Sequence, residues 1–184
     1  MSASLRLVKP EPADEQEFQA MMREWAHNDK RGMITVLKGF RGDFHLFLKS
    51  LEDHSAGIGL PEGHVPSTTY VLKDDSGRLY GIVSFRHRLT DMLRLFGGHI
   101  GYGIRPSERR KGFGTKQLRL ALLKVIEFGL TKVLLTCDAD NPASAGVIEN
   151  NGGVLQWEGF YPPAGRSIRR YMITLAENNK EELS

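Results

Sequence analysis

The stretch RPSERRKGFGTKQLRLALL places three consecutive cations before two glycines and an apolar helical pattern. Arg109, Arg110 and Lys111 repel one another, so an anion is expected to offset their charges. Gly112 and Gly114 carry no Cβ and let the backbone approach phosphate oxygens closely. The first amide N–H groups of a helix have no partner within it, and the helix dipole favours negative charge there. The spacing therefore predicts a phosphate site; the alternative is a solvated basic turn whose glycines only cap the helix.

The common nucleotide-binding motifs do not account for this loop. The pattern GxxxxGK[ST] is absent from the sequence. The pattern GxGxxG fails twice, because Pro106 follows the pair Gly101 and Gly103, and Gln117 stands where the loop would need its third glycine. A different class of phosphate ligand is therefore indicated.

Elements of an α+β protein surround the loop. Two amphipathic helices are predicted in the N-terminal part, because apolar residues recur at i, i+3, i+4 and i+7. Glycines and prolines predict a loop over 53–67, and two strands follow it. The apolar helical positions are Phe18, Met21, Met22 and Trp25 in the first helix, and Phe44, Phe47, Leu48 and Leu51 in the second.

The C-terminal part alternates strands with helices and ends in a hairpin. A glycine-containing strand over 97–106 leads into a helix over 112–128, which Gly129 ends. A strand over 131–138 reads as buried on both faces. Asn141 and Pro142 then open a short helix as N-cap and first helical residue. The closing hairpin covers 154–161 and 167–176.

Composition limits the class of protein. A chain of 184 residues with 40% hydrophobic and 26% charged residues is typical of one globular domain, here 1–184. No apolar run is long enough to span a bilayer, no signal-peptide core is seen at the start, and Cys137 is the single cysteine, so we expect a cytoplasmic protein. The net charge of +3 is concentrated near the loop, which favours a local anion site over a nucleic-acid-binding surface. A nucleic-acid-binding module remains an alternative.

The loop resembles motif A of the GNAT superfamily of N-acetyltransferases, whose signature is matched by Arg109-x-x-Gly112-x-Gly114. GHIGYGIRPSERRKG together with LLTCDADNPASAGVIENNGG looks like one bacterial branch of these enzymes. The resemblance is clearest over 80–175. It implies the GNAT fold: α+β, with a mixed, mostly antiparallel sheet that splays between its fourth and fifth strands, flanked by helices.

The resemblance also implies acetyl-CoA as cosubstrate, with no metal. Its pantetheine arm would pair with the exposed edge of the motif-A strand, and its pyrophosphate would lie on the loop amides. Asn141 resembles the family asparagine that contacts pantetheine, although a plain N-cap is the alternative. The implied cofactor-binding residues are Gly103, Ile104, Arg109, Arg110, Lys111, Gly112, Phe113, Gly114, Thr115, Asn141 and Ser144.

Direct attack of an amine on the thioester needs a base and an acid. His99 stands where related strands often carry Glu and is the first candidate base, with His87 second; a structural strand histidine is the alternative. Many members place a tyrosine where this chain has Ile148. Ser144 and Tyr171 are therefore the candidate acids, with Tyr161 as an alternative in the same hairpin, and protonation of the thiolate by water is a further possibility. Glu108 in the loop is expected to face solvent.

The acceptor is expected to meet the region 13–67. The mildly basic composition argues against a polyamine as acceptor. Four carboxylates could nevertheless attract an ammonium group: Asp43, Glu52, Asp53 and Asp91. A small amine, an amino acid, an aminoglycoside-like compound and a protein N-terminus all remain candidates. The family resemblance also allows a homodimer. A catalytically silent acyl-CoA sensor is the main alternative to an enzyme, because the family tyrosine is missing.

Overall fold

Strands and helices follow one another much as the sequence predicts in the computed structural model, which describes residues 4–27 and 35–175. Residues 28–34, inside the predicted acceptor-side region, lie outside the described part. The strands are β1 (Arg6–Val8), β2 (Ser67–Lys73), β3 (Leu79–Arg86), β4 (Ile100–Ile104), β5 (Lys132–Asp138), β6 (Val154–Tyr161) and β7 (Arg166–Thr174). The α-helices are α1 (Glu15–His27), α2 (Phe44–Ala56), α3 (Asp91–Leu95), α4 (Phe113–Phe128) and α5 (Pro142–Glu149).

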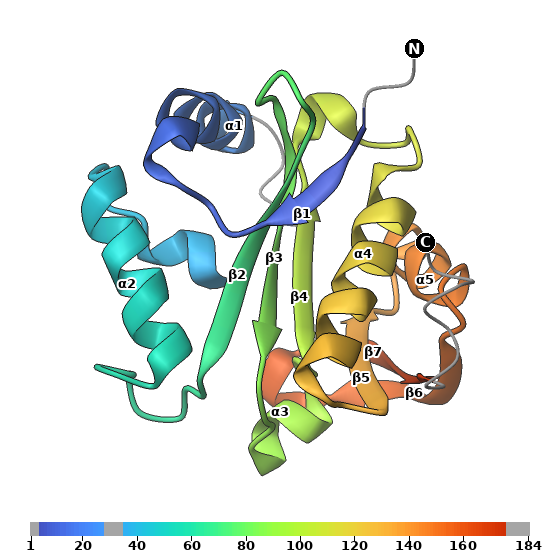
Figure 1. Ribbon diagram of the computed structural model, residues 1–184. Helices are drawn as coiled ribbons and strands as arrows, with labels where there is room; N and C mark the ends of the chain where they lie inside the picture. Colours follow the sequence, from blue (N-terminus) through green and yellow to red (C-terminus); the bar gives the residue numbers. More distant parts are fainter. Residues whose placement is uncertain (1–3, 28–34, 176–184) are drawn as a thin grey trace.

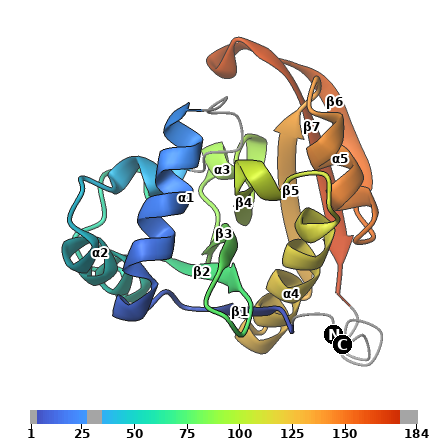
Figure 2. The ribbon, with the colours of Figure 1, turned by 90° about the horizontal axis from the view of Figure 1, so that it is seen from above.

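Two antiparallel sheets form the centre of the fold, with strand orders β1-β2-β3-β4 and β5-β7-β6. Helices α1 and α2 cover one face of the first sheet, and α4 lies on the other side, next to α5 (Figures 1 and 2). The mixed α+β architecture with mostly antiparallel strands is therefore confirmed. No helix in the described ranges is both long and apolar enough to cross a membrane.

The alternation of side chains along β2 and β3 supplies both faces of the first sheet with a core. Val71 and Ile82 pack with the aromatic residues of α1 and α2. Leu72 and Val83 point the other way and pack with Leu118 and other apolar residues of α4. One sheet therefore carries two separate hydrophobic clusters, and the helices on each side are fixed independently.

Helix α3 is the main element that the sequence reading did not contain. The second strand was expected to run through residue 89, but β3 ends at Arg86. The Oγ1 atom of Thr90 accepts a hydrogen bond from the backbone N–H of Leu93 at 3.2 Å and caps the short helix. Its five residues are too few to show a helical apolar period.

Strands β4 and β5 meet at one end only. The backbone N–H of His99 donates to the carbonyl of Leu134 at 2.8 Å, just before β4 begins. Gly98 is left-handed, with φ 63°, and a Cβ there would lie 2.4 Å from the Leu134 carbonyl oxygen. The close approach needs glycine. Beyond this junction the two strands belong to different sheets, so the expected splay between the fourth and fifth strands is confirmed.

Candidate functional site

The loop between β4 and α4 presents free amides at the start of the helix. Gly112 precedes α4 with φ 82° and provides no side-chain cap, and a Cβ built on it would meet nothing within 4 Å. The carbonyl of Gly112 accepts from Lys116, which is the first helical hydrogen bond. The amides of Phe113, Gly114 and Thr115 therefore have no acceptor in the described part of the chain. This arrangement suits an anion.

The three cations of the loop differ in their surroundings. Lys111 Nζ lies 3.0 Å from the Glu108 carboxylate, which also binds Arg78 at 2.5 Å. Glu108 is buried, so the expectation that it faces solvent is wrong. Arg109 Nε donates to the carbonyl of Ile104 at 3.3 Å, and Arg110 is exposed and left-handed, with φ 60°. An internal carboxylate thus balances part of the charge that the sequence suggested a ligand would balance.

Arg105 fixes the beginning of this loop to α1. Its guanidinium is buried and binds Glu17 at 2.7 Å and Glu24 at 2.6 Å. Burial alone would raise the pKa of Glu24, but hydrogen bonds from Arg105 and Ser107 outweigh it and hold that pKa below its ordinary value. The loop that offers the amides is therefore attached to the helix layer on the opposite side of the sheet.

Gln117 of α4 contacts backbone carbonyls of β3 and β4 next to the loop. It is not among the site residues predicted from the sequence. It is fully buried in α4, and its Nε2 lies 3.3 Å from the carbonyl of Ile82 and 3.4 Å from that of Gly103. Its Oε1 has no partner among the described residues. A Cβ at Gly81 would lie 2.2 Å from that oxygen, so the glycine makes room for the amide. In the sequence, a glutamine next to the apolar positions of a predicted helix is the signal that could have indicated this buried polar contact.

The backbone groups of β4 point alternately toward β3 and toward the gap between β4 and β5. The N–H of Arg105 donates to the carbonyl of Tyr80 at 2.9 Å, so within β4 the alternate residues Gly103 and Gly101 turn their backbone groups toward β3. Tyr102 and Ile104 turn theirs toward the β5 side. Of the two predicted main-chain contacts, Ile104 faces the gap, and Gly103 belongs to the β3–β4 ladder.

A pair of hydroxyl groups bridges β4 and α5. The Tyr102 hydroxyl lies 2.9 Å from the Ser144 Oγ, and burial raises the pKa of this tyrosine. Asn141 Oδ1 accepts from the backbone N–H of Ser144 at 3.0 Å, which is the N-cap that the sequence left as one alternative. Ile148 is fully buried in the core. Tyr102 was not expected in this position, because the family pattern places a tyrosine on the helix after Asn141 and not on the motif-A strand.

His99 belongs to the junction of β4 and β5. Its Nδ1 accepts the backbone N–H of Leu134 at 3.0 Å. An amide N–H can only donate, so Nδ1 carries a lone pair and the neutral ring has its proton on Nε2. Burial lowers the pKa of His99, and the charge of Arg94 lowers it further. The neutral ring is thus left without a free basic nitrogen.

Two further candidates for proton transfer, His87 and Tyr171, also have structural partners. His87 Nε2 lies 2.8 Å from Thr68 Oγ1, and its ring lies 4.7 Å from that of Phe128. Tyr171 is buried and donates to Glu149 at 2.9 Å. Burial and this hydrogen bond raise the pKa of Tyr171 to about 12, which holds the proton on its oxygen.

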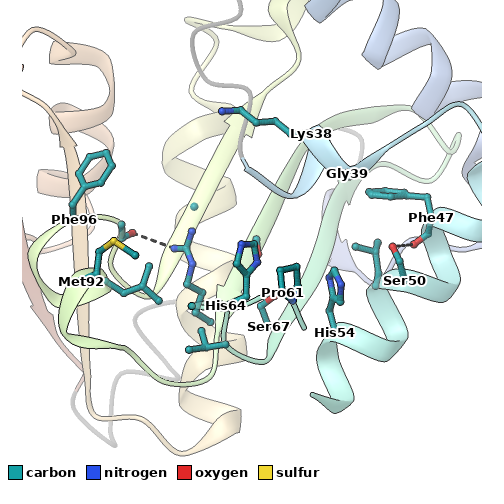
Figure 3. A pocket seen from close by; sticks show the side chains of 18 of the residues that line it. Lys38, Gly39, Phe47, Ser50, His54, Pro61, His64, Ser67, Met92 and Phe96 are labelled. Atoms are coloured by element: carbon teal, nitrogen blue, oxygen red, sulfur yellow. Dashed lines mark hydrogen bonds between the residues drawn. The ribbon is translucent and has the colours of Figure 1, made fainter. Parts of the chain in front are cut away.

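A cavity of about 730 Å³ lies on the opposite side of β4 from α4. Its floor includes Ser84 and Arg86 of β3 and Gly101 of β4. Figure 3 shows Met92 and Phe96 on one side of it and Phe47, Ser50 and His54 on the other, with Pro61 and His64 between them. Gly101 of β4 lines this cavity, so the cavity adjoins the strand that leads into the amide loop.

None of the four carboxylates suggested for an ammonium group is among the described residues that line this cavity. Asp43 caps α2 by accepting from Leu46, and Asp53 pairs with Lys49 at 2.5 Å. Glu52 lines a second, smaller hollow near β1, and Asp91 is exposed at the start of α3. The described residues also contain no group of three or more His, Cys, Asp or Glu arranged to hold a metal ion.

Comparison with solved structures finds the same fold at low identity. RimL, a ribosomal L7/L12 alpha-N-protein acetyltransferase in complex with coenzyme A, is 14% identical with a TM-score of 0.64 over 97% of both chains. The spermidine/spermine N-acetyltransferase SpeG from Vibrio cholerae is 17% identical with a TM-score of 0.61, covering 98% of this chain and 99% of that one. The putative acetyltransferase yncA from Salmonella typhimurium, with acetyl-CoA, is 15% identical with a TM-score of 0.62 over 95% of each chain.

No curated protein sequence matches the chain. A family model described as an acetyltransferase (GNAT) domain matches residues 3–154, which is most of the chain and includes the amide loop and α5. The splayed strands and the loop of free amides agree with that match. The chain therefore belongs to the GNAT acetyltransferase family.

Proposed function

We propose that this protein transfers the acetyl group of acetyl-CoA to a primary amine, by direct attack within a ternary complex. One observation carries the proposal: a loop of free amides and a separate cavity adjoin the same strand. The free amides begin beyond Ile104 at the end of β4, and the cavity reaches β4 at Gly101. A cosubstrate held from the loop would have its reactive end beside the cavity.

The residues available for acetyl-CoA fit its chemistry. The amides of Gly112 to Thr115 would bind the pyrophosphate, and Arg109 and Arg110 would add positive charge. The backbone groups of Ile104 would bond the pantetheine, with Asn141 and Ser144 on the other side of the gap. Lys111 would contribute less to binding the pyrophosphate, because its ammonium group already pairs with Glu108.

In the proposed reaction the amine nitrogen attacks the thioester carbonyl, a C–N bond forms, and the C–S bond breaks to release the thiol of CoA. The ammonium nitrogen loses one proton to solvent water before attack and a second one as the amide forms, and the departing sulfur takes up one proton, so that one proton is released overall. We propose the Tyr102–Ser144 pair as the proton donor to sulfur, and a junction-holding role for His99. Replacing Tyr102 by Phe should lower kcat about tenfold with little change in KM for acetyl-CoA, since a thiolate leaves without much help; an unchanged kcat would remove Tyr102 from this role.

The test is an amine panel incubated with the protein and acetyl-CoA. Release of free thiol, with a mass increase of the amine by one acetyl group, is the expected result. Binding of acetyl-CoA without release for any amine would favour the silent acyl-CoA sensor. Steeply salt-dependent binding to DNA or RNA would favour the nucleic-acid module. A cytoplasmic location stays a prediction from the sequence.

A further inference from the structure

We call the cavity of about 730 Å³ the acceptor cavity, because the proposed amine would bind there. The ionisable side chains among its described lining residues are all basic. Lys38, His54, His64, Arg86 and Arg166 line it, and none of its described lining residues is Asp or Glu. Arg166 is already balanced, because its Nε lies 2.7 Å from Asp138. The other basic groups have no carboxylate partner among the described residues.

Arg86 is the central group. It lies half-buried on the cavity floor, and its Nη1 donates to the carbonyls of Gly97 at 3.2 Å and Gly98 at 2.9 Å. A guanidinium has five N–H donors, so Nε and Nη2 remain without an acceptor in the described part of the chain. A partly buried cation with no counter-ion is unfavourable unless a ligand supplies one. The two glycine carbonyls hold Arg86 next to the junction of β4 and β5.

We propose that the acceptor is a small amine that also carries an oxyanion, either a carboxylate or a phosphate, and that Arg86 and Lys38 bind this group in the cavity. The inference rests on the proposed acetyl transfer. A volume of about 730 Å³ suits a small molecule. Phe47, Met92 and Phe96 on the walls provide apolar contacts for its carbon skeleton.

The same charges affect the amine. Positive groups nearby disfavour an ammonium ion and lower the pKa of a bound amine, so more of it is present as the neutral nucleophile. A polyamine without an oxyanion meets only repulsion from Arg86 and Lys38. The cavity therefore selects against polycations by charge as well as for oxyanions.

Matched pairs of amines test the proposal. Phenylalanine is compared with phenethylamine, phosphoethanolamine with ethanolamine, and spermidine serves as the polycation; kcat/KM is measured from thiol release. We expect the oxyanion-bearing member of at least one pair to be preferred about tenfold or more, and the responding pair distinguishes carboxylate from phosphate. A preference for spermidine over both oxyanion-bearing amines, or no preference for the oxyanion-bearing member in either pair, would overturn the inference and leave acetyl transfer intact.

Variants assign the preference to the cavity. Arg86→Gln and Lys38→Gln should each reduce it about tenfold, and Arg86→Lys should retain part of it by keeping the charge. Arg88→Gln, an exposed arginine just beyond β3, is the matched control and should leave the preference unchanged. Affinity for CoA, measured by calorimetry, reports separately that the fold is intact. An unaltered preference in Arg86→Gln with normal CoA binding would contradict the role of Arg86.

A binding measurement covers the case in which no amine releases thiol, which would refute the proposed catalysis. Calorimetry of the protein saturated with CoA then compares 3-phenylpropionate with phenethylamine. The carboxylate should bind at least about tenfold more tightly. Equal binding, or tighter binding of the amine, would overturn the inference.

Discussion

Tyr102 and Ser144 show how a pair of hydroxyl groups can be assembled from two separate elements, β4 and α5. The family pattern led to a search on α5, where this chain has the buried Ile148. The phenol comes instead from β4 and reaches α5 across the gap. Tyr171, the sequence-based alternative, is buried in the core, and its hydroxyl already donates to Glu149. Single residues therefore have to be located in space before they receive a role.

The first residue-scale prediction concerns Gly112→Asp. The left-handed φ of 82° strains any other residue, and a carboxylate would stand next to the amides that should bind pyrophosphate. We expect affinity for CoA, measured by calorimetry, to fall at least about tenfold. Gly129→Asp is the matched control, because Gly129 has φ 98° and open space at the other end of the same helix. Equal affinities in the two variants would refute the phosphate site.

The second residue-scale prediction concerns His99 and pH. The folded-state pKa of His99 is lowered from its ordinary 6.5, so below about pH 6.5 the unfolded chain takes up a proton that the folded protein does not. Stability should be complete above this pH and fall as the pH drops toward the lower folded-state pKa. His99→Asn, which can keep an acceptor near Nδ1, should weaken the dependence, and His87, with its own lowered pKa, should preserve part of it.

Urea unfolding at about pH 7.5 and about pH 5.5 measures this difference. The same variant also tests catalysis, because a base role for His99 would change the pH profile of kcat/KM, whereas a junction role would leave its shape unaltered. An unchanged stability slope would show that His99 does not titrate as described.

At the scale of elements, the packing of α4 against β3 and β4 decides how the loop is held. Gln117 bonds carbonyls of both strands, and Gly81 leaves the space it needs. A helix carrying only leucines at these positions would pack as well but would not bond the strands next to the loop. The glycine and the glutamine therefore act as a pair from different elements.

The element-scale prediction is that Gly81→Ala destabilises the protein. The new Cβ would lie 2.2 Å from Gln117 Oε1 and 2.6 Å from the carbonyl oxygen of Gly103. We expect the free energy of unfolding to fall by about 2 kcal/mol and Tm to fall by roughly 4–8 °C. Gly146→Ala in α5, where a Cβ meets nothing within 4 Å, should be neutral or stabilising. Similar losses in both variants would contradict the packing argument.

At the scale of the whole molecule, the two hydrophobic clusters have to be held in register across the first sheet. Arg105 contributes to this because it lies at the end of β4, next to the loop, and binds two carboxylates of α1. The exposed apolar residues of β6 lie on the far hairpin, away from this connection (Figure 2). Sedimentation would test the homodimer that the family resemblance allows.

The corresponding prediction is that Arg105→Gln lowers the free energy of unfolding by about 2 kcal/mol. Breaking a buried pair usually costs more, but Glu17 and Glu24 are partly exposed and would be re-solvated. Arg23→Gln, an exposed arginine on the same helix α1, should change stability by less than about 0.5 kcal/mol. Chemical denaturation of both variants measures these changes. An unchanged midpoint for Arg105→Gln would show that the ion pairs of Arg105 do not contribute to holding α1.

The sequence by itself determined the family, the order of most elements and the amide loop, because these depend on local patterns: helical periodicity, glycine positions and the motif from Arg109 to Gly114. Tertiary structure decided which groups meet. It buried Glu108 beneath Lys111, turned the backbone of Gly103 toward β3 and that of Ile104 toward the gap, and gave His99 a backbone partner. It also gathered cations from separated segments around one cavity. Such contacts join residues far apart in the chain, and no spacing within a single segment encodes them.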